Sequence, residues 1–90
     1  MITRQIRVWG RVQGVGFRFF TQQLAIQLDI TGTVQNKMDG SVLAVAQGEP
    51  NAVNRFIERV KASTSPYGRV DRYEECPLLD APLFTKFEII

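Results

Sequence analysis

Apolar side chains alternate with other residues in the first segment of the chain. Ile6, Val8 and Val12 occupy even-numbered positions, and Arg7 lies between the first two. An alternation with a period of two is typical of a β-strand that buries one face. We therefore expect a strand over residues 3–12.

Two later segments have a different spacing, in which apolar residues recur every three or four positions. These segments are Phe17 to Leu28 and Val53 to Val60. This spacing places apolar side chains on one side of an α-helix. We expect one helix over residues 17–29. A second is expected from Glu49-Pro50, because proline suits a first helical turn, to about Ala62.

Four further strands are indicated by residues that favour extended backbone and by the turns between them. Residues 31–36 and 41–47 flank Lys37-Met38-Asp39-Gly40, in which Asp-Gly suits a tight hairpin turn. Residues 69–75 alternate weakly after a loop rich in serine, proline and glycine. Residues 84–90 are expected to form a short final strand.

The predicted order is β-α-β-β-α-β followed by a short C-terminal strand. This order is typical of an α+β ferredoxin-like split βαβ sandwich, an antiparallel sheet with both helices on one face. The 90 residues suffice for one hydrophobic core, so we expect a single domain over residues 1–90.

The open face of this sheet is expected to carry some apolar residues. If Val8 and Val42 face the core, then Trp9, Leu43 and Val45 face the other way. A small dimer contact is one interpretation. Scattered apolar residues are common on protein surfaces, however, so we expect a monomer.

The charge of the chain is small but unevenly distributed. Eleven basic and nine acidic residues give a net charge of +2, which does not indicate a nucleic-acid binder. The first acidic residue is Asp29, so nothing in residues 1–28 neutralises the four arginines found there. That part of the chain is expected to attract anions.

Several other classes of protein are not indicated. The longest aliphatic run, Val42 to Ala46, is too short to cross a bilayer, and the first residues lack the apolar core of a secretory signal. We therefore expect a cytoplasmic protein without membrane contact. The lone Cys76 and the dispersed acidic residues provide no metal-ligand spacing, and we expect Cys76 to be a small, semi-buried residue.

The segment from Gly10 to Arg18 joins the first strand to the first helix. Gly14 and Gly16 allow the backbone N–H groups to converge, and the start of the helix adds unbonded donors. Arg18 would lie over the same point, where its planar guanidinium matches a phosphate group. The alternative is an ordinary tight turn followed by a solvated arginine. Nucleotide-binding loops are excluded, because Phe17 follows Gly16 where a Walker loop needs lysine.

The string Gly-Arg-Val-Gln-Gly-Val-Gly-Phe-Arg, at residues 10–18, resembles the signature of the acylphosphatase family. Gly-Thr-Val-Gln-Asn at residues 32–36, followed by Asp-Gly-Ser-Val at 39–42, is similar to the second motif of that family. The resemblance covers essentially the whole chain.

The resemblance implies metal-independent and cofactor-free hydrolysis of the carboxyl-phosphate anhydride of acyl phosphates. Arg18 and Asn36 would be catalytic, with Asn36 positioning the attacking water. The phosphoryl group, or inorganic phosphate or sulfate, would be bound by the Arg18 guanidinium and by loop amides. These amides belong to Gln13, Gly14, Val15, Gly16 and Phe17.

The chemistry of the residues agrees with this function. The chain has no histidine and no carboxylate before Asp29, so the loop region lacks an evident base or nucleophile. An acyl phosphate needs neither, because its carboxylate leaves readily. Two alternatives stay open at this point: an RNA-binding module on the same fold, and a non-catalytic anion-binding domain. The central strand over residues 41–47 has no aromatic residue, which disfavours the first.

Overall fold

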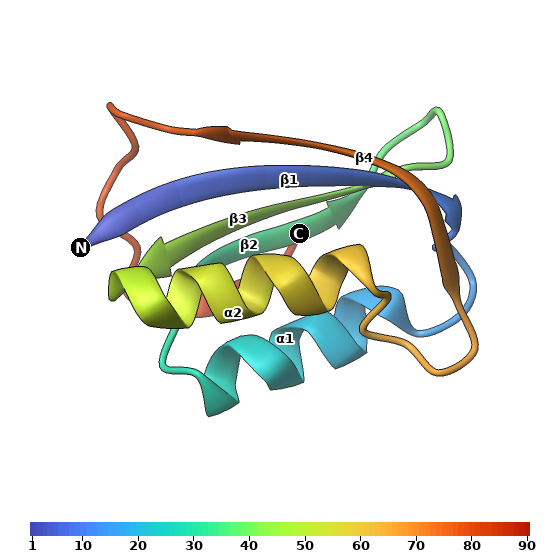
Figure 1. The fold of residues 1–90 in the computed structure, drawn as a ribbon, viewed down its shortest axis with the longest axis horizontal. Helices are drawn as coiled ribbons and strands as arrows, with labels where there is room; N and C mark the ends of the chain where they lie inside the picture. Colours follow the sequence, from blue (N-terminus) through green and yellow to red (C-terminus); the bar gives the residue numbers. More distant parts are fainter.

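The computed structural model describes residues 1–90 and contains a five-stranded sheet with two helices (Figure 1). The elements are, in chain order, β1 (Ile2–Arg11), α1 (Phe17–Gln27), β2 (Thr31–Asn36), β3 (Val42–Gly48), α2 (Pro50–Lys61), β4 (Arg69–Pro77) and β5 (Phe87–Ile89). The strand order is β4-β1-β3-β2-β5. Both helices cover the same face of the sheet, so the predicted α+β ferredoxin-like sandwich is confirmed.

All neighbouring strands are antiparallel except β2 and β5, which are parallel. The central strand β3 pairs with β1 on one side and with β2 on the other. Strands β1 and β2 therefore run in the same direction, and their C-terminal ends lie at the same end of the sheet. The loops that follow these two strands are brought close together by this arrangement.

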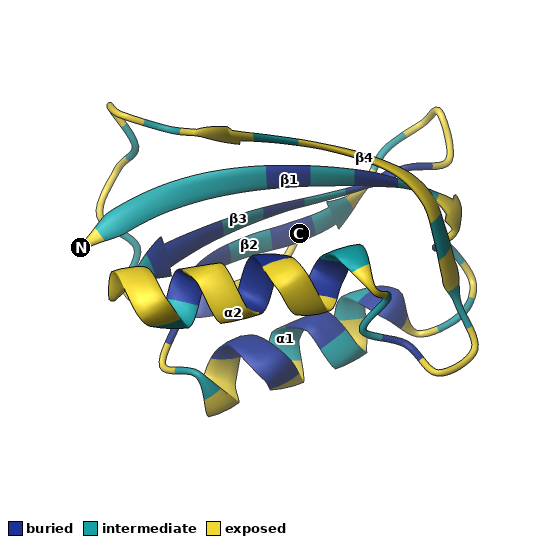
Figure 2. Cartoon of the chain, in the orientation of Figure 1, coloured by how far each residue is buried: buried dark blue, intermediate teal, exposed yellow.

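The core lies between the sheet and the helices and contains 16 buried apolar residues. Buried and exposed residues alternate along α2, because only one side of this helix faces the sheet (Figure 2). Val8 and Val42 are both buried, as the alternation predicted. Burial of such side chains contributes about 1.5–3 kcal/mol each, which makes this layer the main stabilising element.

The end of α1 lies two residues earlier than the predicted position at Asp29. Asp29 adopts a left-handed conformation, with φ 58°. Its N–H donates to Ile26 O at 3.2 Å, and the N–H of Ile30 donates to Ala25 O at 2.8 Å. These two bonds form a Schellman motif, which satisfies the last carbonyl groups of the helix and ends it.

The final strand is shorter than predicted, because it begins at Phe87 rather than Phe84. The N–H of Phe84 donates to Oε1 of the buried Gln47 side chain at 2.9 Å. The segment before β5 is thus held by a side chain of β3 and not by a strand ladder. Alternation in the sequence does not report such a contact.

The open face of the sheet is covered in part by its own charged side chains. The guanidinium carbons of Arg7 and Arg72 lie 5.4 and 4.1 Å from the centre of the Trp9 ring. Such cation–π contacts shield an aromatic ring that would otherwise face water. Leu43 and Val45 are half-buried, so this face presents no large exposed apolar patch at these positions.

The expectation that Cys76 is semi-buried is wrong, because the structure places it in an exposed position. Cys76 lies on the edge strand β4 and pairs with Gln5 of β1. The next residue of β1, Ile6, faces the core, so Gln5 and its partner Cys76 face the open side.

Gly32 of β2 has a φ of 144°, and a Cβ at this position would collide with the carbonyl oxygen of Val45. We therefore expect Gly32→Ala to lower the free energy of unfolding by at least about 2 kcal/mol. Urea denaturation followed by circular dichroism measures this change. Gly48→Ala is the matched control, because an added Cβ would meet no atom closer than 3.5 Å. Equal stability of Gly32→Ala and the control would contradict the steric argument.

Candidate active site

Residues 12–16 connect the end of β1 to the start of α1 and form a sharply curved loop. Both of its glycines have left-handed backbone conformations, with φ 75° at Gly14 and 78° at Gly16. Gly16 is also the N-cap of α1, and no side chain caps this helix end. Glycine adopts positive φ without the steric cost that a Cβ imposes, which explains the residue type at both positions.

The backbone N–H groups of this loop have no partner within the protein. None of the N–H groups of residues 13–17 donates a hydrogen bond to a backbone or side-chain acceptor. Unbonded N–H groups at the start of a helix, together with the positive end of its dipole, favour an anion. The loop therefore has the properties of an anion-binding cup.

Arg18 is the second residue of α1 and contributes a free positive charge to this region. Its side chain takes part in none of the six ion pairs of the molecule. The guanidinium remains available for an external anion, since no carboxylate of the protein neutralises it. The planar group can bind two phosphate oxygens at once.

Asn36 is the last residue of β2 and precedes the hairpin turn. Two backbone hydrogen bonds close this turn. Lys37 N donates to Ser41 O at 2.8 Å, and Gly40 N donates to Lys37 O at 3.1 Å. Asn36 itself pairs with Val42 in the ladder. Its exposed side-chain amide makes no hydrogen bond within the protein, so it does not stabilise the turn in the way that turn asparagines commonly do.

A cavity of about 250 Å³ brings these groups together. Five of the seven predicted site residues line it: Gly14, Gly16, Phe17, Arg18 and Asn36. The other lining residues are Val12, Phe19 and Ile89. Gln13 and Val15, which were predicted through their backbone N–H groups, do not line the cavity.

Gln13 has a structural role that its position in the motif did not reveal. Its Nε2 donates to Lys37 O at 2.8 Å and to Ser41 O at 2.9 Å. One amide group thus joins the curved loop to the β2–β3 turn. The bridge fixes the distance between the loop and the strand end that carries Asn36.

A second support comes from the loop between α2 and β4, which the sequence indicated only as a break in regular structure. The buried Ser65 hydroxyl donates to the carbonyl oxygen of Val15. The hydroxyl of Thr64 lies 2.8 Å from that of Thr21, and Thr64 also donates to Phe17 O at 3.4 Å. These bonds occupy carbonyl oxygens of the cup and leave its N–H groups free. Only the serine and threonine content of this loop could have indicated this role.

The turn after Asn36 is held by Asp39, whose carboxylate accepts four hydrogen bonds. Oδ1 accepts from the backbone N and the hydroxyl of Ser41, at 3.0 and 2.6 Å. Oδ2 accepts from Arg7 Nη2 at 3.0 Å and Trp9 Nε1 at 3.1 Å. The hydroxyl and then the N–H of Ser41 hold the pKa of Asp39 far below its ordinary value, and Trp9 and Arg7 lower it further.

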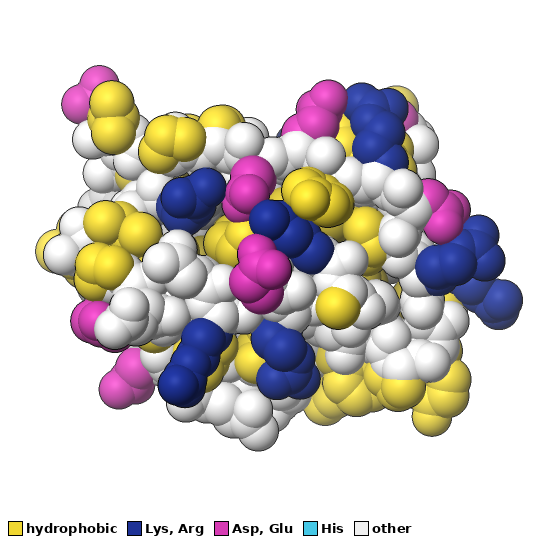
Figure 3. All heavy atoms as spheres, viewed as in Figure 1, with side chains coloured by type: hydrophobic (Ala, Val, Ile, Leu, Met, Phe, Trp, Pro, Cys, Tyr) yellow, Lys and Arg dark blue, Asp and Glu magenta, His cyan; other side chains and the backbone are white.

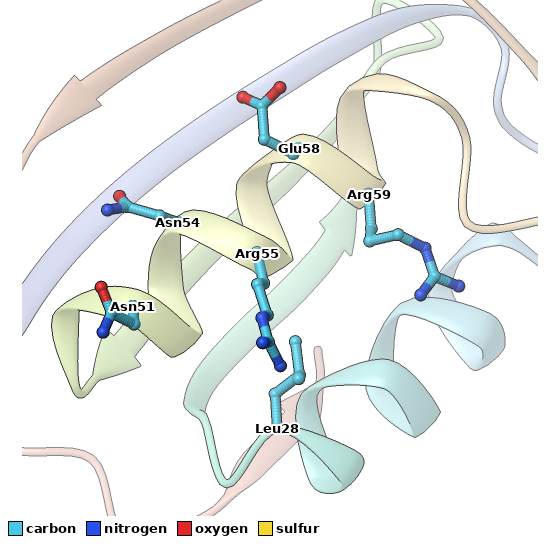
Figure 4. A pocket seen from close by; sticks show the side chains of 6 residues that line it. All are labelled: Leu28, Asn51, Asn54, Arg55, Glu58 and Arg59. Atoms are coloured by element: carbon cyan, nitrogen blue, oxygen red, sulfur yellow. The ribbon is translucent and has the colours of Figure 1, made fainter.

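A larger hollow of about 590 Å³ lies elsewhere, along α2 (Figure 4). Arg55 and Arg59 point toward α1, whereas Asn54 and Glu58 point to the other side of α2. The side chains do not converge on one point, and the hollow contains no unbonded backbone donors from a helix start. The smaller cavity is therefore the better candidate for a functional site.

Three further observations concern metal ligands, membrane-spanning helices and surface charge. No group of three or more Asp, Glu, Cys or His side chains is arranged to hold a metal ion. None of the helices has the length and apolar character needed to span a membrane. On the face seen in Figure 3, basic and acidic side chains are interspersed and do not form a patch of one sign.

Comparisons with known proteins place the chain in a family. The Acylphosphatase family model matches residues 4–89. An acylphosphatase of Lacticaseibacillus paracasei is 50% identical over 88 residues, 98% of this chain and 95% of that protein. One of Lactobacillus gasseri is 49% identical over 90 residues, 100% of this chain and 99% of that protein. The crystal structure of acylphosphatase from Bacillus subtilis matches with a TM-score of 0.94 and 38% identity, over 100% of this chain and 99% of that one.

The fold and the cavity define a small α+β protein in which an anion-binding loop and an unpaired arginine meet at one end of the sheet. Within this class, the chain belongs to the acylphosphatase family. The resemblance of its two sequence motifs to those of the family is thus confirmed.

The hydrogen bonds of Asp39 predict a specific dependence of stability on pH. Because the folded-state pKa is depressed, ionised Asp39 stabilises the fold above its unfolded pKa of about 3.9. This contribution is lost as the pH falls from there toward the folded-state pKa. Asp39→Asn should therefore show a smaller decline in unfolding free energy than the parent between about pH 5 and pH 2.

Urea denaturation at a series of pH values measures these slopes. The matched control is Asp80→Asn, because Asp80 is exposed and takes part in no ion pair. Parallel pH profiles for the parent and Asp39→Asn would show that the hydrogen bonds to Asp39 contribute nothing to acid stability.

Proposed function

We propose that this chain hydrolyses the carboxyl-phosphate anhydride of acyl phosphates to a carboxylate and inorganic phosphate. The observation that carries the proposal is the composition of the cavity. It contains Arg18, Asn36 and glycine backbone, but no carboxylate, thiol, hydroxyl or imidazole side chain that could serve as nucleophile or general base. Such a site suits a substrate whose leaving group needs no protonation.

The free N–H groups of residues 13–17 and the guanidinium of Arg18 bind the phosphoryl group in this mechanism. They stabilise the negative charge on its oxygens as the bond to the acyl group breaks. Inorganic phosphate or sulfate would occupy the same cup, because each has the shape and charge of the group being transferred.

Asn36 positions the attacking water beside the phosphorus atom. Its side-chain carbonyl accepts a hydrogen bond from the water, and its NH₂ group can donate to a phosphoryl oxygen. The water oxygen forms a bond to phosphorus while the bond between phosphorus and the acyl oxygen breaks. The carboxylate leaves with that electron pair, and a phosphoryl oxygen takes the proton of the water.

The remaining features of the proposal concern the setting of the reaction. The single hydrophobic core supports one domain, and the charged side chains over Trp9 on the open face of the sheet support a monomer. The exposed thiol of Cys76 suits a reducing compartment, which supports the cytoplasm. Arg18 and the backbone N–H groups stabilise the negative charge of the phosphoryl group in this proposal, so the reaction requires neither metal nor cofactor.

The direct test is an assay of acetyl phosphate hydrolysis with and without excess chelator. Equal turnover in both conditions supports the proposal. Activity that disappears with chelator and returns with a divalent ion would overturn the metal-independent mechanism. Phosphate binding without any turnover would favour a non-catalytic anion-binding domain.

Arg18→Lys keeps the charge but removes the planar, two-pronged donor. We expect kcat/KM for acetyl phosphate to fall by about 10²-fold or more, and inhibition by inorganic phosphate to weaken. Steady-state kinetics with phosphate as a competing ligand measure both effects. Arg55→Lys on α2 is the control and should behave as the parent. Near-normal activity of Arg18→Lys would show that Arg18 contributes only its positive charge and no two-pronged contact.

Asn36→Ala separates positioning of the water from binding of the phosphoryl group. We expect kcat to fall by about 10²-fold or more while the inhibition constant for phosphate changes little, because the lost interaction is made mainly in the transition state. Asn54→Ala, an exposed asparagine on α2, serves as the control. A folded Asn36→Ala protein with normal kcat would show that Asn36 has no catalytic role.

A further inference from the structure

The residues that line the cavity are of two chemically different kinds. The proposed function assigns the phosphoryl group and the water to Gly14, Gly16, Arg18 and Asn36. The other four lining residues are apolar: Val12, Phe17, Phe19 and Ile89. An acyl phosphate also has two parts, a charged phosphoryl group and an acyl group. The apolar lining residues are available for the second part.

Phe19 and Ile89 differ from the other two apolar residues in their exposure. Val12 and Phe17 are buried in the core, whereas 54% of Phe19 and 40% of Ile89 is exposed. The exposed pair therefore adds little to the core but presents apolar surface at the cavity. Exposed apolar groups that line a cavity commonly mark a place where a ligand is bound.

The ring of Phe19 is held in place beside the cup. It packs edge-to-face against Phe20, with ring centroids 5.4 Å apart and planes at 75°. Phe20 in turn lies against Gly16, where an added Cβ would be only 3.3 Å from its Cε2 atom. An aromatic ring that is already ordered loses little conformational freedom when a ligand packs on it.

Ile89 reaches the same cavity from the other end of the chain. It pairs with Val34 of β2, and the N–H of Ile90 donates to Val34 O at 3.0 Å. Gln22 of α1 donates from Nε2 to Phe87 O at 3.0 Å, which ties the helix that carries Phe19 to the strand that carries Ile89. The two elements that carry Phe19 and Ile89 are thus held beside one another.

We propose that Phe19 and Ile89 form an acyl-binding subsite that favours aromatic acyl groups over the two-carbon acetyl group. This inference rests on the proposed function. An aromatic ring on the substrate would remove apolar surface of Phe19 and Ile89 from water, and acetyl is too small to do the same. The subsite selects the substrate, whereas the polar lining residues carry out the reaction.

The test compares kcat/KM for benzoyl phosphate and acetyl phosphate in the parent, in Phe19→Ala and in Ile89→Ala. We expect each variant to lose about 5- to 10-fold with benzoyl phosphate and less than about twofold with acetyl phosphate. Inhibition by inorganic phosphate should be unchanged in both, because the phosphoryl cup is intact. Thermal unfolding confirms that the variants are folded.

Ile26→Ala is the matched control, because Ile26 lies on the same helix as Phe19, is 59% exposed and lines no cavity. It should leave the ratio of the two kcat/KM values unchanged. Equal losses with both substrates in Phe19→Ala and Ile89→Ala, or an unchanged ratio, would overturn the subsite while leaving the hydrolytic function in place. A parent protein that hydrolyses neither substrate would overturn the function and the subsite together.

Discussion

The pairing of β3 with both of its neighbours is the constraint on which the site depends. Val42, at the start of β3, pairs with Val8 of β1 and with Asn36 of β2. Because β1 and β2 both run antiparallel to β3, the loop after β1 and the C-terminal end of β2 lie together at one end of the sheet. A slip of one residue in the ladder between β2 and β3 would turn Asn36 to the opposite face of the sheet. The burial of Val34 on β2 and Val42 on β3 opposes such a slip.

The register of the ladders brings the loop after β1 near the end of β2, and polar contacts then fix the spacing between them. The Gln13 amide joins the cup to the carbonyl oxygens of Lys37 and Ser41. The carboxylate of Asp39 holds the same turn from the open face through Ser41, Arg7 and Trp9. A proposed mechanism that relies on positioning needs this rigidity, because small displacements of a water-orienting group reduce the rate strongly.

The sequence was sufficient for those features that depend on local pattern. The strand over residues 31–36 has the predicted bounds, and the cup is found where two glycines precede a helix. It was insufficient where a distant residue decides the outcome. Phe84 donates to the side chain of Gln47 in place of a strand neighbour, and Cys76 is exposed because it faces the open side of the sheet on the edge strand β4. The roles of the Gln13 and Ser65 side chains likewise depend on partners more than 20 residues away.

The absence of acid, base and nucleophile side chains from the cavity restricts the proposed reaction as much as the groups that are present. Arg18 and free N–H groups can stabilise charge on a phosphoryl group, but nothing in the cavity can protonate a poor leaving group. Alkyl phosphate esters, whose alkoxide must be protonated as it leaves, would therefore react slowly in it. A carboxylate leaves without a proton, so electrostatic stabilisation and an oriented water suffice for an acyl phosphate. The polar lining residues thus select the bond that is cleaved, and the selection between acyl groups is left to the apolar side chains of Phe19 and Ile89.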